Sequence, residues 1–218
     1  MSELKIQGFT MNPFQENTYL VWDSDTKDAA LFDPGCSNAS EIDALEQFIT
    51  ENRLLLSQLI NTHCHIDHVL GNQYFAEKYD LPLQAHAEEQ SILEMARESS
   101  ILYQIPYTPS PSIAVYLSEN NTIKIGTHEL KIRFTPGHSP GSLCFVNVQQ
   151  KWALVGDVIF QNSIGRTDLP RGNYEDLIGS IQKHIYTLPN ETVLYSGHGL
   201  PTTVGHEKKH NPFVREKE

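Results

Sequence analysis

Strand-like and helix-like patterns of apolar positions follow one another along the chain. In the first third, short apolar or alternating runs are separated by turn residues such as Asp33-Pro34-Gly35, which is typical of strands. Strands are predicted at residues 4–10, 17–22, 29–32, 54–60 and 83–85. Apolar side chains at helical spacing between residues 40 and 49 predict a helix, and two further helices are predicted at 67–79 and 87–103.

The strand pattern starts again after a proline-containing loop at residues 108–112, which is the best internal boundary. Strands are predicted at residues 123–125, 129–135, 142–147, 152–155 and 192–195, with a helix at 174–188. Groups of strands with helices between them favour an α/β protein in which two sheets pack face to face and helices lie outside. At 218 residues, the chain is interpreted as one domain over residues 1–218, although two closely packed halves fit as well.

Composition and charge narrow the function classes. A formal net charge of −11 disfavours nucleic acid as a partner. The first residues lack a basic segment followed by an apolar one, and no run approaches 18 apolar residues, so neither a secretory signal nor a membrane span is expected. The scattered Cys36, Cys64 and Cys144 suit a reducing compartment, and a cytoplasmic location is expected.

The densest chemical signal is Thr62-His63-Cys64-His65-Ile66-Asp67-His68, between a predicted strand and a predicted helix. Three imidazoles and one carboxylate within six residues are suitable ligands for zinc or iron. In such a turn, His63 and His65 can converge on one ion, while Asp67 and His68 can point toward a neighbouring ion. Surface histidines in a polar turn are the alternative interpretation of this segment.

Further ligands for two metal sites are expected at the ends of other strands. His138, Asp157 and His198 each come shortly after a strand-like run, and each directly follows a glycine. A lone histidine in such a place is more commonly a hydrogen-bonded structural group. Together with the first cluster, however, these three residues complete the number of ligands that two ions require.

This ordered set resembles the metallo-β-lactamase superfamily, and the segment 203–212 resembles the C-terminal signature of its glyoxalase II-like hydrolases. The resemblance implies a four-layer αββα sandwich with two divalent metal ions at one edge. It implies that His63, His65 and His138 bind the first ion, that Asp67, His68 and His198 bind the second, and that Asp157 bridges the two. Zinc is the leading assignment, and His/Asp sites also accept iron or manganese.

Differences between this chain and the motifs of individual branches of the family narrow the expected activity. His68 and Asp157 differ from the pattern of the commonest β-lactamases, so antibiotic hydrolysis is not expected. The segment Gly165–Asp168 resembles the mononuclear iron persulfide dioxygenases, but the Gly-His-Gly around His198 favours a complete second site. Arg166 matches a basic substrate-contacting position of glyoxalase II, whereas Asp168 replaces an aromatic residue. The helical glutathione-binding domain of glyoxalase II is expected to be absent, because only 20 residues follow His198.

The leading hypothesis is a thioesterase of the hydroxyacylglutathione hydrolase type that acts on a small molecule. Two ions about 3.5–4 Å apart can share a water and activate it as a bridging hydroxide that attacks a carbonyl carbon. Asp67 is expected to orient this nucleophile, and Arg166 either contacts an anionic part of the substrate or forms a structural salt bridge. A mononuclear iron persulfide dioxygenase is the alternative, followed by a non-catalytic metal-binding protein. The oligomeric state is left open.

Some residues are interpreted as having no catalytic role. His206-Glu207-Lys208-Lys209-His210 fits the zinc-protease pattern, but it is rich in lysine and close to the end of the chain. Glu88, Glu89 and Glu94 are interpreted as a solvated helix face.

Overall fold

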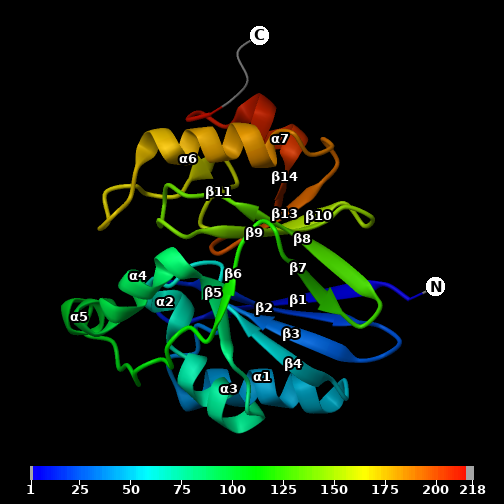
Figure 1. The fold of residues 1–218 in the computed structure, drawn as a ribbon, viewed down its shortest axis with the longest axis vertical. Coiled ribbons are helices and arrows are strands. Elements are labelled where there is room, and N and C mark those ends of the chain that lie inside the picture. Colours follow the sequence, from blue (N-terminus) through cyan, green and yellow to red (C-terminus); the bar gives the residue numbers. More distant parts are fainter. Residues whose placement is uncertain (1, 215–218) are drawn as a thin grey trace. The chain divides into compact units, whose positions relative to one another are not determined.

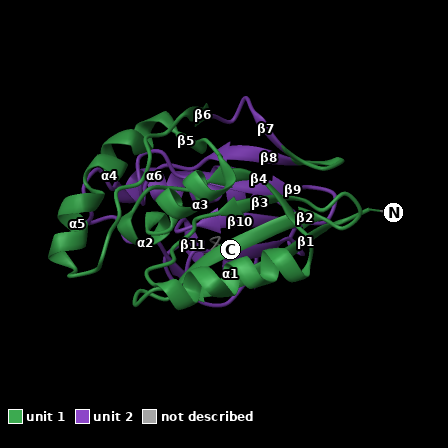
Figure 2. Cartoon of the chain, turned by 90° about the horizontal axis from the view of Figure 1, so that it is seen from below, with its two compact units in different colours: residues 1–117, 124–129 green, residues 118–123, 130–218 purple. Residues whose placement is uncertain are grey.

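The computed structural model describes residues 2–214, which divide into two compact units (Figure 1, Figure 2). Unit 1 extends to Leu117 and includes Lys124–Glu129, while unit 2 contains Ser118–Ile123 and the chain from Leu130 onward. Two six-stranded sheets with helices confirm the predicted α/β class. The division at Leu117 lies close to the predicted boundary at 108–112. The prediction of a single domain over residues 1–218 stays a prediction.

The sheet of unit 1 follows the order of the chain from β1 to β6. Its strands are β1 (Leu4–Met11), β2 (Glu16–Asp23), β3 (Asp28–Phe32), β4 (Leu55–Ile60), β5 (Leu83–His86) and β6 (Val115–Leu117). The first three strands are antiparallel, whereas β3, β4, β5 and β6 run parallel to one another. The carboxyl ends of the parallel strands therefore meet at one edge of the sheet, where loops can bring side chains together.

Helices α1 (Ala39–Glu51) and α3 (Asn72–Tyr79) lie along one face of this sheet (Figure 1). The start of α1 is stabilised by Asn38, whose side chain accepts a hydrogen bond from the amide of Glu41. Its apolar positions Leu45 and Ile49 are buried in a core shared with residues of the sheet. The hydrophobic spacing at residues 40–49 therefore predicted this helix correctly.

Two long predicted helices are broken in the structure. The segment predicted at 67–79 forms α2 (Ile66–Val69) and α3, because the amide of Gly71 donates to the carbonyl of Pro34 at 2.7 Å. The segment predicted at 87–103 forms a 3₁₀ helix (Ala87–Glu89), α4 (Gln90–Glu94) and α5 (Ala96–Leu102). Apolar periodicity persists across such breaks, so it overestimates helix length.

The sheet of unit 2 has the order β14-β13-β10-β9-β8-β7, and parts of β7 and β8 group with unit 1. Its strands are β7 (Thr122–Ile125), β8 (His128–Phe134), β9 (Leu143–Asn147), β10 (Trp152–Gly156), β13 (Val193–Ser196) and β14 (Thr202–Thr203). A separate hairpin consists of β11 (Ile159–Phe160) and β12 (Ser163–Ile164). Neighbouring strands β10 and β13 are parallel, so their carboxyl ends lie at the same edge.

Two helices lie on one face of the sheet of unit 2 (Figure 1). Helix α6 (Tyr174–Ser180) continues as a π-helical segment (Ile181–Ile185), and α7 (Val204–His210) follows β14. The predicted helix at 174–188 is thus present with a change of helix type. Within residues 2–214, no helix has the length and apolar character that a membrane crossing requires.

Candidate metal centre

Four predicted ligands of unit 1 lie on one loop and the short helix that follows it. His63 and His65 come between β4 and α2, while Asp67 and His68 belong to α2. The ring of His63 lies with its centroid 4.9 Å from that of His65 and 4.1 Å from that of His68. His68 Nε2 is 3.7 Å from Asp67 Oδ2. Two ligands of one tetrahedral zinc ion lie about 3.4 Å apart, given bonds of about 2.0–2.2 Å, so this pair fits a shared ion.

Asp33 and Thr62 determine which nitrogen of His63 can bind a metal. Asp33 follows β3 and meets the loop after the neighbouring parallel strand β4, where it accepts hydrogen bonds from the amide and the hydroxyl of Thr62 at 2.7 and 2.6 Å. The single hydroxyl proton of Thr62 is thereby used, so its oxygen accepts the hydrogen bond, 3.1 Å long, that it forms with His63 Nδ1. The proton of His63 is therefore on Nδ1, and Nε2 presents its lone pair to an ion.

Asp33 is better described as a partner of the ligands than as a ligand itself. Asp33, His63 and His68 do offer atoms within 4.8 Å of one another. However, Asp33 Oδ1 accepts from Thr62 and Asn61, and Oδ2 accepts from Thr62 and lies 3.2 Å from His68 Nδ1. A carboxylate behind the second nitrogen of a histidine orients that ring toward a metal.

The side chains of Asn12 and Asn61 hold α2 in place. Asn12 donates to the carbonyls of Gly35 and Asp67, both at 2.9 Å, and Asn61 donates to the carbonyl of His68 at 2.9 Å. Glu16 is fully buried beside them, with Oε1 3.8 Å from His68 Nδ1. Burial raises the pKa of Glu16 well above its usual value, despite the opposing effect of His68. A Cβ on Gly35 would lie 2.1 Å from Glu16 Oε2, so this close packing requires glycine.

Glu89 corrects one interpretation of the sequence. Glu88 and Glu94 are exposed as predicted, but Glu89 is completely buried. Its Oε2 accepts a hydrogen bond of 2.7 Å from the amide of Cys64, the residue between His63 and His65. The helical spacing of the three glutamates gave no sign of this contact.

The three predicted ligands of unit 2 lie together. Asp157 Oδ2 is 3.5 Å from His138 Nε2 and 3.5 Å from His198 Nε2. Both separations match those of ligands that share an ion, and the same carboxylate faces both histidines. His138 Nδ1 is 2.7 Å from the carbonyl oxygen of Arg166, which can only accept, so Nδ1 carries the proton and Nε2 is available to a metal.

The sheet and α6 position these ligands. Asp157 and His198 follow the parallel strands β10 and β13, and the amide of Gly197 donates to the carbonyl of Gly156 at 2.8 Å. His138 lies in a turn in which Gly137 has φ of 138° and packs so closely that a Cβ would meet the amide nitrogen of Leu177 at 2.2 Å. Glycine is therefore required directly before the ligand.

Arg166 forms a salt bridge with Asp168, two positions further along the chain. Its Nε and Nη2 donate to the two carboxylate oxygens of Asp168 at 2.7 and 2.8 Å, and both side chains are exposed. The hydrogen bonds from Arg166 lower the pKa of Asp168 to about 2. The structure thus contains the salt bridge that was one of the two roles expected for Arg166. The other role, contact with a substrate, stays a prediction.

The protease-like motif lies on α7 and has a structural glutamate. Glu207 is fully buried and accepts hydrogen bonds from the amide of Asn162 and the hydroxyl of Thr202. His206 contacts Asn162 Oδ1 at 2.8 Å. Because Glu207 is engaged in this network, it is not placed to act as the general base of a protease.

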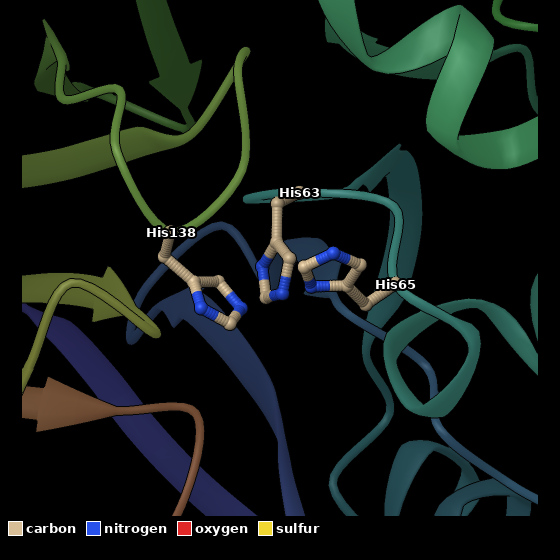
Figure 3. Close-up of side chains that lie close together, drawn as sticks. All are labelled: His63, His65 and His138. Atoms are coloured by element: carbon tan, nitrogen blue, oxygen red, sulfur yellow. The ribbon is translucent and has the colours of Figure 1, made fainter. Parts of the chain in front are cut away.

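The donors of each unit fit divalent metal ions by chemistry and spacing. Figure 3 shows His63 and His65 on the loop after β4, and it labels His138 on the loop after β8. Imidazole nitrogens with fixed tautomers and carboxylate oxygens are the ligands that zinc, iron and manganese accept. The three cysteines are all buried, and burial raises the pKa of Cys144 to about 12. Residues 2–214 therefore present no exposed thiol as an alternative ligand or nucleophile.

Comparison with known proteins gives matches along nearly the whole chain. The family model described as the metallo-beta-lactamase superfamily matches residues 11–198. The chain is 36% identical to the hydroxyacylglutathione hydrolase GloC of Haemophilus influenzae, covering 98% of this chain and 100% of that protein. It is 37% identical to the probable metallo-hydrolase YqgX of Bacillus subtilis, covering 97% and 98% of the two chains.

Solved structures agree with this assignment of the fold. The B3 metallo-beta-lactamase BLEG-1 matches with a TM-score of 0.88 at 34% identity, covering 97% of this chain and 100% of that one. TTHA1623, solved in a di-iron-bound form, matches with a TM-score of 0.85 at 31% identity over 95% and 100% of the two chains. ETHE1 from Myxococcus xanthus matches with a TM-score of 0.80 at 25% identity over 98% and 86%. These matches confirm the predicted fold class and the resemblance.

Proposed function

Because the chain belongs to the metallo-beta-lactamase superfamily, in which it is a metallo-hydrolase, we propose that it is a binuclear enzyme that hydrolyses small thioesters. The similarity to a hydroxyacylglutathione hydrolase over the full length of both proteins supports this substrate class. The observation that carries the proposal is the position of Asp157, whose one carboxylate oxygen faces two histidine nitrogens at 3.5 Å each.

Seven residues are proposed to bind two metal ions. His63, His65 and His138 bind the first ion, Asp67, His68 and His198 bind the second, and Asp157 bridges them. The ligand-like separations within each unit support this assignment, as does a family model that spans both units. Zinc is the first choice, and iron is an alternative because a similar protein has been solved with two irons.

Divalent ions held by these residues would supply an activated water and polarise the carbonyl of the substrate. The Asp67 carboxylate is proposed to accept a hydrogen bond from the attacking water and so to orient it toward the carbonyl carbon. A bond forms between this carbon and the water oxygen, the carbon–sulfur bond breaks, and the departing thiolate takes up the proton that the water loses. No serine or cysteine nucleophile is needed, in keeping with the burial of all three cysteines.

Arg166 is proposed to contact an anionic part of the substrate. Its carbonyl holds the ring of His138, so the residue is one hydrogen bond away from a proposed ligand. The guanidinium is exposed but shared with Asp168, so an anionic substrate must compete with this carboxylate. We therefore expect modest affinity and a broad range of acyl groups.

Replacement of Arg166 by alanine is expected to raise the KM for an anionic thioester by up to about tenfold while changing kcat much less. A charge-assisted hydrogen bond contributes about 1.5–3 kcal/mol at most, and the competition with Asp168 reduces the effect. Steady-state kinetics with a glutathione thioester and an uncharged thioester measure it. Arg133→Ala, which removes an exposed arginine from β8, is the control. An equal rise of KM for the uncharged ester would contradict the assigned contact.

The proposed function is tested with a panel of S-acyl thiols and a free-thiol assay on the metal-loaded protein. Release of thiol from several small thioesters is the expected result. A β-lactam is included in the panel, because one similar structure is a B3 metallo-beta-lactamase and the expected absence of antibiotic hydrolysis remains a prediction.

An oxygen electrode with glutathione persulfide tests the alternative function in parallel. The similarity to ETHE1 keeps a persulfide dioxygenase as the second candidate. A dioxygenase consumes molecular oxygen, whereas hydrolysis does not. Oxygen uptake without thiol release from any thioester would replace the thioesterase by the dioxygenase, and a single bound iron per chain would agree with that outcome.

A further inference from the structure

A carboxylate buried behind the metal-binding loop has no role in the chemistry proposed above. Glu89 is the last residue of the 3₁₀ helix that follows β5, and none of its surface is accessible to solvent. Burying a carboxylate is unfavourable unless charge or hydrogen bonds compensate for the lost hydration. Its neighbour Glu88 is exposed, so the local sequence does not force Glu89 inward.

Glu89 forms a hydrogen bond with the backbone between two proposed ligands. Glu89 Oε2 accepts from the amide of Cys64 at 2.7 Å, which is a short distance for a bond between an amide and a carboxylate. The loop between β4 and α2 is irregular, so no helix or strand ladder fixes this peptide. The orientation of the amide of Cys64 determines how the chain leaves His63 and enters His65.

A second carboxylate holds the same loop one residue before His63. Asp33 binds the amide and hydroxyl of Thr62, just before His63, while the side chain of Cys64 is itself fully buried. Asp33 and Glu89 thus fix two peptide groups that are two residues apart, from different segments of unit 1. A loop held at both points keeps the two imidazoles of His63 and His65 at their observed separation of 4.9 Å between ring centroids.

We propose that Glu89 is a positioning residue that holds His63 and His65 in the geometry in which they bind the first metal ion. The inference rests on the proposed metal centre, but it does not depend on which substrate is hydrolysed. Partners outside the first set of ligands commonly change metal affinity by about 10–100-fold when they are removed.

The test compares Glu89→Gln and Glu89→Ala with a matched pair of variants, Asp23→Asn and Asp23→Ala. Asp23 is also a fully buried carboxylate of unit 1 and accepts hydrogen bonds from the amides of Asp25 and Thr127. It lies at the far end of β2 from Glu16, about 23 Å along an extended strand of this length. Removal of a buried carboxylate should lower the stability of the folded protein in the Glu89 variants and in the Asp23 variants alike, whereas only Glu89 is close to the proposed metal ligands.

Three quantities are measured on full-length protein: Zn²⁺ affinity by chelator competition, Tm of the metal-free form, and the visible spectrum of the Co²⁺-loaded form. We expect Zn²⁺ affinity to fall about threefold to tenfold in Glu89→Gln and about 10–100-fold in Glu89→Ala, with an altered Co²⁺ spectrum. Glutamine keeps an acceptor for the amide of Cys64 but loses the charge, so its smaller effect is part of the expectation. Both Asp23 variants should lower the Tm of the metal-free form and leave Zn²⁺ affinity unchanged.

The proposal would be overturned if Glu89→Gln kept the Zn²⁺ affinity and the Co²⁺ spectrum of the wild-type protein. Where Glu89→Ala does not fold, the result with Glu89→Gln alone is used to test the proposal. Equal losses of affinity in the Glu89 and Asp23 variants would overturn it too, because they would indicate general destabilisation. Failure of the proposed function is seen separately, as the absence of thiol release by a wild-type protein that binds metal.

Discussion

Asp157→Ala is expected to leave the protein with almost no bound metal and with no turnover above background. The reason is that one carboxylate oxygen lies 3.5 Å from Nε2 of both His138 and His198, as expected for a ligand shared by two ions. Its removal would leave each ion one ligand short and would take away negative charge that compensates the charge of two neighbouring cations. Elemental analysis after desalting and a thioester assay measure the two effects.

Asp176→Ala is the matched control for this substitution. Asp176 is an exposed aspartate in the first turn of α6 in the same unit, and its replacement should leave metal content and turnover unchanged. Full metal content and full turnover in Asp157→Ala would show that the bridging assignment is wrong. Retention of one ion per chain would restrict Asp157 to a single site.

His65→Ala is expected to lower kcat/KM by more than about 10²-fold while the metal-free protein keeps its fold. Removal of a residue that only supports a metal ligand commonly lowers metal affinity or activity by about 10–100-fold, and removal of a ligand itself should lower activity by more than that. His65 is half-buried on a loop and caps α2 only through its backbone, so little packing is lost. The Tm of the metal-free form should change by no more than about 4 °C, equivalent to roughly 1 kcal/mol for a chain of this size.

The variants His206→Ala and His210→Ala are controls for His65→Ala, because each removes one of two histidines whose rings lie close together. The rings of His206 and His210 have centroids 4.9 Å apart, the same separation as those of His63 and His65, but they lie on α7 beside a buried structural glutamate. Metal content and turnover should stay at wild-type levels in both variants. A loss of metal in His206→Ala equal to that in His65→Ala would contradict the assignment of the metal centre.

Most of the strands could be predicted from local sequence, whereas the short strands β6, β11, β12 and β14 were not predicted. Strands β1, β2, β3 and β10 lie within one or two residues of their predicted positions, because alternation and burial of apolar residues depend on the segment itself. His138, Asp157 and His198 were proposed as ligands because each directly follows a glycine near the end of a predicted strand, and functional side chains commonly lie at such strand ends. The chemistry of the donor atoms then predicted metal binding without any knowledge of distances, and this assignment stays a prediction.

The tertiary structure decided how the loop that carries His63 and His65 is supported. Asp33 and Glu89 reach Thr62 and Cys64 across 29 and 25 positions of the chain, and hydrophobic periodicity contains no information about partners at such separations. The same limit applies to the helix predicted at 67–79, since its break involves a hydrogen bond from Gly71 to the carbonyl of Pro34, which is remote in the chain. The sequence predicted which groups could bind metal, because ligand chemistry belongs to the side chain. Tautomer, orientation and burial were decided by the fold, because they depend on neighbours that are remote in the chain.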